Sequence, residues 1–159
     1  MYRTWFVLAA AIVALDQLTK WAVLGHFAYG ERREITGFFN LVLVYNKGAA
    51  FSLFAQAAGW QTPLLAAFAL AAAVIVSVLI LRNPDRGLLC LGLALILGGA
   101  VGNLIDRLRF GHVVDFLDFH ALGWHWPAFN VADSAISIGA VLLILEGFVH
   151  HEKRAGAPS

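Results

Sequence analysis

Two long runs without a charged side chain constrain this sequence more than any other feature. One extends from Trp60 to Leu81 and the other from Gly87 to Ile105. A helix needs about 20 consecutive apolar residues to cross the hydrocarbon core of a bilayer, and both runs have about that length. Because a helix that is apolar on all sides has no face suited to water, the two runs predict membrane spans at 60–81 and 87–106.

Two further apolar segments contain a few charged residues and predict spans at 5–24 and 132–149. Asp16 and Lys20 interrupt the first of them, and Asp133 and Glu146 lie near the two ends of the second. Asp16 and Lys20 are four residues apart, so we expect them to share one helix face and to pair inside the bundle. The sequence therefore predicts one membrane domain over residues 1–159, with four spanning helices and both termini on the same side.

The composition excludes several other classes of protein. Apolar residues make up 60% of the chain and charged residues 13%, whereas a soluble domain has about 45–50% and about 25%. A net charge of +1 provides no basic field for nucleic acid. Cys90 is the single cysteine, which excludes an intrachain disulfide and a site where several cysteines bind zinc.

Positive charges near the ends of the spans predict the orientation. Arg3, the short turn at 82–86 and the tail pair Lys153-Arg154 fall on one side of the membrane. Since basic residues in short loops favour the cytoplasm, we expect both termini to be cytoplasmic. A cleavable leader is the alternative for the N-terminus, but the apolar segment has no small-x-small site before a polar start.

The two connections on the other side carry most of the remaining sequence signals. In the first, at 25–59, residues 38–45 are largely apolar with some alternation, which predicts a short β structure or an amphipathic element on the membrane surface. The second, at 107–131, is rich in His, Trp, Phe and Asp. Polar residues at membrane depth are costly and need a partner or a purpose, and here they gather at the ends of the spans that face these connections.

Asp115 and Asp133 are the strongest catalytic candidates among these polar residues. Each is flanked by apolar neighbours, and each lies beside the end of a predicted span. Two adjacent carboxyl groups in a low-dielectric site cannot both ionise easily, so one can act as a base while the other donates a proton. Such a pair can hydrolyse a peptide bond without a metal. Asp133 is expected in the first turn of a helix, where the dipole favours its charged form.

Simpler interpretations exist for the same residues. Asp133 follows Asn130 by three positions and could be part of a helix cap. Asp106-Arg107 is expected to form a local ion pair, and Asp118 is expected to be solvated. No two of the six histidines have the spacing of a helical zinc site, and neither Ser52 nor Ser134 has a nucleophile motif. A transporter that uses the buried charges as a relay and a noncatalytic membrane scaffold are the competing functional classes.

Five short motifs, taken in order, resemble those of the lipoprotein signal peptidase (signal peptidase II) family. They begin in the first predicted helix and end in the last. The segments are Asp16-Gln17-Leu18-Thr19-Lys20, Asn46-x-Gly48-Ala49-Ala50-Phe51-Ser52, Gly98-Gly99-Ala100-x-Gly102-Asn103-Leu104-Ile105-Asp106-Arg107, Val113-Val114-Asp115-Phe116 and Phe129-Asn130-x-Ala132-Asp133-Ser134.

The resemblance implies a fold, an activity and a set of roles. It implies four transmembrane helices with a small extracytoplasmic β-cradle and a surface helix, in the bacterial inner membrane. It implies an aspartic endopeptidase, with no metal or cofactor, that removes the signal peptide from diacylglyceryl-modified prolipoproteins just before the lipidated cysteine. The inhibitor globomycin, membrane lipid and a monomeric state belong to the same expectation. The implied catalytic residues are Asp115 and Asp133, the substrate- and inhibitor-binding residues are Asn46, Gly48, Asn103, Arg107 and Asn130, and the supporting residues are Asp16, Lys20 and Asp106.

Overall fold

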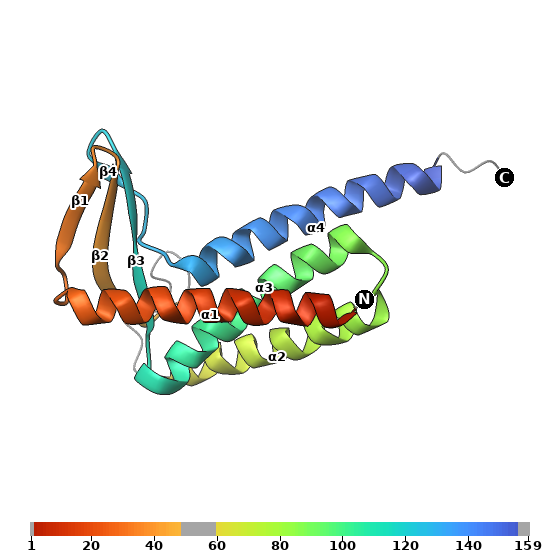
Figure 1. Ribbon diagram of the computed structural model, residues 1–159, viewed down its shortest axis with the longest axis horizontal. Coiled ribbons are helices and arrows are strands. Elements are labelled where there is room, and N and C mark those ends of the chain that lie inside the picture. The colour runs from red at the N-terminus through yellow and green to blue at the C-terminus, as the bar shows by residue number, and fades with distance from the viewer. Residues whose placement is uncertain (1, 49–59, 156–159) are drawn as a thin grey trace.

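Four long helices and a small sheet make up the structure, a computed structural model that describes residues 2–48 and 60–155 (Figure 1). The helices are α1 (Tyr2–His26), α2 (Gln61–Arg82), α3 (Gly87–Phe110) and α4 (Val131–Ala155). All four are long and apolar enough to cross a membrane, over Tyr2–His26, Gln61–Arg82, Gly87–Phe110 and Val131–Val149. The prediction of four spans is confirmed. Helices α1, α3 and α4 extend beyond the predicted ranges, and α2 is shifted by one residue from its predicted range.

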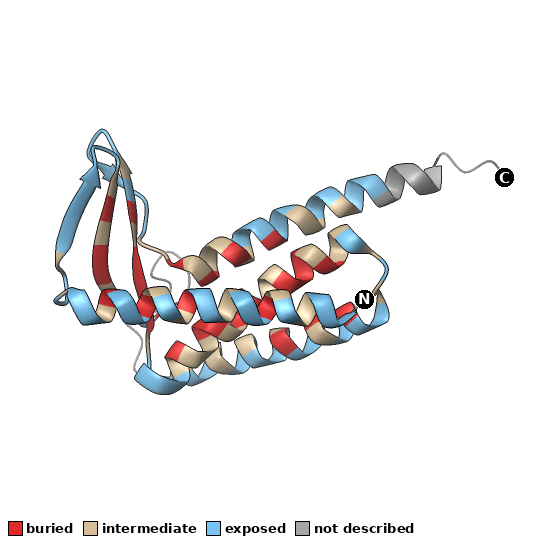
Figure 2. Cartoon of the chain, viewed as in Figure 1, coloured by how far each residue is buried: buried red, intermediate tan, exposed pale blue. Residues whose placement is uncertain are grey.

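Helix α3 lies at the centre of the bundle and packs against the other three helices. Half of its most apolar window is buried (50%), against 22% in α1 and 17% in α2 and α4. The outer helices therefore expose most of their apolar side chains around the bundle, where lipid surrounds a spanning protein (Figure 2). The buried centre includes Ile80, Cys90, Leu93 and Leu97.

Glycine allows α3 and α4 to approach closely. A Cβ atom added at Gly139 would lie 2.6 Å from the carbonyl oxygen of Gly92, and one at Gly99 would collide with the carbonyl oxygen of Ala132. Small residues at a helix interface permit this contact between backbones inside a membrane. As a result the first turn of α4, which carries Asp133, is fixed directly against α3.

The sheet lies across one end of the bundle, where α1 ends and α4 begins (Figure 1). Its strands are β1 (Arg32–Thr36), β2 (Phe39–Asn46), β3 (Val113–Ala121) and β4 (Trp124–His125), in the order β1-β2-β3-β4, with each neighbouring pair antiparallel. The β structure predicted for 38–45 is confirmed. Residues 27–48 contain no counterpart of the expected surface helix, and the rest of the first connection, 49–59, is outside the described residues.

A second apolar cluster attaches the sheet to the last turns of α1. It contains Val23, Leu43, Val114 and Phe116. The pairing of β2 with β3 shifts between Leu41 and Val44, and Val44 is the partner of Asp115. Such irregularities locally re-aim a side chain. The cluster and the register together hold Asp115 at the junction of the sheet and the helices.

Candidate active site

Asp115 and Asp133 come from different elements that meet at the sheet end of the bundle. Asp115 is in the first half of β3 and is 2% exposed. Asp133 is in the first turn of α4 and is partly buried. The two carboxyl groups are close enough for the charge of Asp133 to act on Asp115. The structure thus brings together the two residues that the sequence predicts as a pair.

Asn130 joins the two aspartates through its side chain and its backbone. Its Nδ2 donates to Oδ1 of Asp115 at 2.8 Å, and its backbone N–H donates to Oδ2 of Asp133 at 3.3 Å. In return the backbone N–H of Asp133 donates to Oδ1 of Asn130 at 2.9 Å. This reciprocal pattern has the form of a capping box. The cap interpretation of Asp133 therefore holds for Oδ2, while Oδ1 is directed elsewhere.

Two further asparagines donate to the remaining carboxylate oxygens. Nδ2 of Asn103 lies 2.8 Å from Oδ1 of Asp133, and Nδ2 of Asn46 lies 3.1 Å from Oδ2 of Asp115. Each carboxyl group thus has both oxygens hydrogen-bonded to neutral amides. Neutral donors stabilise a carboxylate without cancelling its charge, which leaves the group able to exchange a proton.

Arg107 and Gly48 complete the set of residues predicted to bind substrate. The Arg107 guanidinium donates to the carbonyl oxygens of Asn103 and Gly48, each at 3.4 Å. The backbone N–H of Gly48 donates to Oδ1 of Asn46 at 3.0 Å. All five predicted binding residues therefore lie around the two aspartates. The neighbouring motif residues 49–52 are outside the described residues.

The electrostatic setting of Asp115 differs from that of a carboxyl group in water. Burial raises the pKa of Asp115 to about 7, and the negative charge of Asp133 acts in the same direction. Hydrogen bonds from Asn46 and Asn130 oppose this rise in pKa but do not cancel it. Near neutral pH a large fraction of Asp115 is therefore protonated, which is the state that a proton donor needs.

A buried ionic cluster lies behind the aspartates. The ammonium of Lys20 is 2.8 Å from Oδ2 of Asp16 and 2.8 Å from Oδ2 of Asp106, and all three side chains are at most 3% exposed. The predicted pairing of Asp16 with Lys20 is confirmed. The expected local pair of Asp106 with Arg107 is wrong, because the helix turns the two adjacent side chains to different faces and Asp106 contacts Lys20.

The cluster also contacts the backbone just before each catalytic candidate. Oδ1 of Asp16 accepts the N–H of Ala132 at 2.9 Å, and Oδ2 of Asp106 accepts the N–H of Val114 at 3.0 Å. Lys20 itself donates to Oδ1 of Asn103 at 2.9 Å. A Cβ atom at position 102 would lie 2.6 Å from Oδ2 of Asp16, so Gly102 provides the space that this arrangement needs.

Gln17 is a participant that the sequence alone did not identify. Its Nε2 donates to Oδ1 of Asp106 at 2.9 Å and to the carbonyl oxygen of Gly102 at 3.1 Å. The only signal for it in the sequence is its place between Asp16 and Lys20 in the first motif. Its partners lie 85 and 89 residues further along the chain, and no local pattern relates them.

Asp118 is a second residue whose setting differs from the prediction. It is 3% exposed and not solvated. Asn40 donates to it at 2.8 Å, Nδ1 of His125 lies 2.9 Å away, and Nε of Arg32 lies 3.4 Å away. These partners come from the other three strands of the sheet and cover the side chain. In the described parts of the chain, no three His, Cys, Asp or Glu side chains are grouped as a metal ion would require.

Four spanning helices, with buried aspartates where the bundle meets a small sheet, define a multi-pass membrane protein with a polar site at one end. The sequence profile of the family described as signal peptidase (SPase) II matches residues 8–149. The chain belongs to the signal peptidase II family, whose members are aspartic peptidases.

Relatives and solved structures agree with this membership. The lipoprotein signal peptidase of Ralstonia nicotianae is 61% identical over 142 residues, covering 89% of this chain and 82% of the relative. That of Paraburkholderia phytofirmans is 56% identical, covering 89% and 83%. A structure described as a bacterial membrane enzyme, determined by the in meso method at 2.3 Å, superposes with a TM-score of 0.84 at 27% identity, covering 98% of this chain and 94% of the other.

Proposed function

We propose that this chain is the endopeptidase that removes the signal peptide from diacylglyceryl-modified prolipoproteins, with Asp115 and Asp133 as its catalytic pair. The proposal rests on the hydrogen bonds of Asn130. At the junction of the bundle and the sheet, this residue donates to the carboxyl groups of both Asp115 and Asp133. The names of the relatives, all lipoprotein signal peptidases, support the substrate class. Cleavage just before the lipidated cysteine follows from the family resemblance.

The geometry supports a division of roles between the two aspartates. Asp115, with a pKa of about 7, is the proton donor to the scissile carbonyl oxygen. Asp133, which receives donors from Asn103 and from the backbone of Asn130, is the base that takes a proton from water. The resulting hydroxide adds to the carbonyl carbon, and the C–N bond then breaks as a proton passes to the amide nitrogen.

The other residues of the site position the substrate and the pair. In this proposal Asn46, Gly48, Asn103, Arg107 and Asn130 bind the substrate backbone or a peptide-like inhibitor such as globomycin. Asp16, Lys20 and Asp106 support the two aspartates from behind. The whole chain acts as one monomeric domain in the bacterial inner membrane. Both termini are cytoplasmic and the site faces the opposite side, in contact with lipid and not with nucleic acid.

The lipid on the substrate provides the direct test of this function. Purified protein in lipid should cut a diacylglyceryl-modified prolipoprotein and leave the unmodified precursor intact, because the acyl chains hold the scissile bond at the depth of the pair. Electrophoresis and mass spectrometry of the products measure both the rate and the cleavage position. Equal cleavage of both precursors, or loss of activity on adding EDTA, would contradict the proposal.

The raised pKa of Asp115 predicts the pH dependence of the reaction. Below a pH of about 7 Asp115 keeps its proton and can donate it, and above that value it is ionised and cannot. We therefore expect kcat/KM to fall as the pH rises through about 7. Because the hydrogen bond from Asn46 lowers the pKa of Asp115, Asn46→Ala should move this fall to higher pH. A rate that stays constant through neutral pH would count against Asp115 as the donor.

A further inference from the structure

The far end of the sheet carries exposed apolar side chains that the catalytic site does not use. Between β3 and β4 the chain turns at Leu122 and Gly123, both with positive φ (50° and 82°). Leu122 is fully exposed at 102%. Trp124 (84%) and Trp126 (60%) follow this turn, and Phe38 (59%) lies in the connection of β1 to β2, where its carbonyl oxygen accepts the N–H of His120. These four residues, Phe38, Leu122, Trp124 and Trp126, are called the hairpin patch below.

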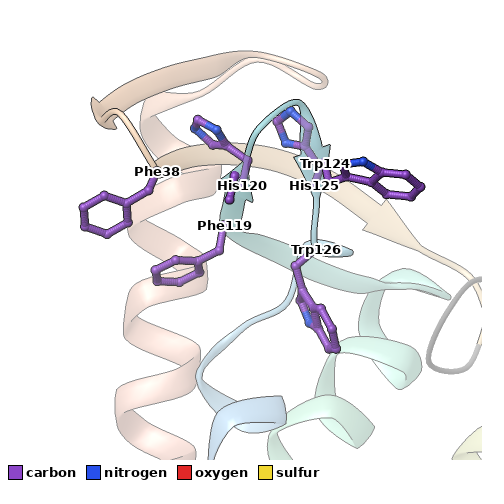
Figure 3. A pocket seen from close by; sticks show the side chains of 7 residues that line it. Phe38, Phe119, His120, Trp124, His125 and Trp126 are labelled. Carbon is purple, nitrogen blue, oxygen red and sulfur yellow. The ribbon is translucent and has the colours of Figure 1, made fainter.

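The hairpin of β3 and β4 has one polar face and one apolar face, because the side chains of β3 alternate between the two faces. Asp118 and His120 point to one face, where His120 stacks on His125 at 5.0 Å between ring centroids. Phe119 points to the other face and packs against Phe39 at 4.8 Å. The register places Trp124 opposite Ala121, on the face of Phe119. Figure 3 shows the two histidine rings on one side, with the rings of Phe119 and Trp126 on the opposite side, toward the helices.

The apolar face of the hairpin lies over space that lipid occupies. Figure 1 shows that the β4 end of the sheet reaches sideways beyond the first turn of α4, at about the level where α1 ends. Because the four helices cross the membrane, the region beside them at this level is the headgroup layer of the bilayer. The patch thus lies at the level of this layer. Tryptophan and tyrosine are enriched in that layer.

A hollow of about 400 Å³ within the patch has the same character. It is lined by the apolar side chains of Phe38, Phe119, Ala121, Trp124 and Trp126 and also by His120 and His125, so residues of both faces contribute to it. Exposed apolar groups clustered in this way mark an interaction surface. Asp118 and its ionic partners Arg32 and His125 lie on the face of the sheet opposite to Phe119. These charged side chains therefore point away from the bilayer.

We propose that the hairpin patch docks into the headgroup layer of the leaflet on the sheet side and holds β3 at a fixed depth. Asp115 is on the same strand, six residues before the end of β3 at Ala121. Anchoring the far end of this strand therefore fixes the height of Asp115 relative to the lipid. The docking itself is independent of the proposed function, and only its effect on cleavage rests on that function.

Spin labels on single cysteines test the docking directly. In a Cys90→Ala background of the full chain, Leu122→Cys places a label in the patch. Glu34→Cys is the matched control, because Glu34 is exposed on β1 and pairs with Asn40 on the polar face. In nanodiscs of phosphatidylcholine and phosphatidylglycerol, the label at position 122 should collide severalfold more with oxygen than with a water-soluble nickel complex. The label at 34 should show the reverse. Equal preference for nickel at both positions would overturn the proposal.

The effect on depth has a separate measurement. Leu122→Ser combined with Trp124→Ser removes apolar groups that are exposed in the fold, so it leaves the protein core intact. Cleavage of a lipidated precursor in bilayers should fall by about tenfold, because a displacement of about 1 Å can cost about 10²-fold in rate. Cleavage in detergent micelles, which adapt to the protein, should be nearly unchanged. An unaltered rate in bilayers would overturn depth control. A wild-type protein without activity would instead refute the proposed function and leave the spin-label result valid.

Discussion

Replacing Asp133 or Asp115 by asparagine should lower kcat for prolipoprotein cleavage by about three orders of magnitude. General acid–base catalysis by one positioned group contributes about 10²–10⁴-fold. An asparagine cannot exchange the proton, although it keeps the shape of the side chain. At position 133 the new amide oxygen can still accept the N–H of Asn130, as Oδ2 of Asp133 does. The fold is therefore retained, and the loss belongs to the chemistry. Single-turnover cleavage of a lipidated peptide measures it.

The same strand provides a matched control for the change at position 115. Asp118 is also buried on β3, but its partners are Asn40, Arg32 and His125 and it does not contact the site. Asp118→Asn makes the same side-chain substitution on the same strand and should keep kcat within about threefold of the wild type. If Asp115→Asn or Asp133→Asn retained a tenth or more of the activity, the two aspartates would not be the catalytic pair.

The parts of the fold that the sequence predicts are those determined by local composition. Uncharged runs of bilayer length predict the spans, because a helix in lipid satisfies its own backbone and needs only apolar side chains. The apolar, partly alternating residues at 38–45 predict a strand, since one face of a sheet packs on the helices. These features do not depend on which distant segment comes to lie beside them.

The parts that were missed depend on partners far along the chain. Asp118 has the polar and aromatic neighbours of a surface residue, yet Asn40, 78 residues away, covers it. Asp106 lies next to Arg107 in the sequence but binds Lys20 on another helix. Sequence neighbours on a helix point about 100° apart, so adjacency is a poor guide to pairing. The cap and catalytic interpretations of Asp133 are compatible, because its two oxygens have different partners.

The ionic cluster gives the second large expected effect, which concerns Lys20. In Lys20→Met, Asp16 and Asp106 lose the ammonium that both of them contact at 2.8 Å. Removing one partner from a buried ion pair destabilises a protein by about 3–5 kcal/mol, because a charge remains buried without compensation. We expect a loss of that size in the free energy of unfolding, measured by denaturation in detergent. A loss below about 1 kcal/mol would contradict it.

A second variant separates the stability effect of Lys20 from its effect on the site. Adding Asp16→Asn to Lys20→Met removes one unpaired charge, while the amide oxygen still accepts the N–H of Ala132 as Asp16 does. Much of the lost stability should return. Activity should stay low, because Oδ1 of Asn103 has lost the shorter of its two hydrogen bonds, the one from Lys20 at 2.9 Å, and keeps only the one from Asn130 at 3.2 Å. The Nδ2 of Asn103 is then held less firmly toward Asp133. If activity returned together with stability, Lys20 would support only the fold and would not orient the catalytic pair.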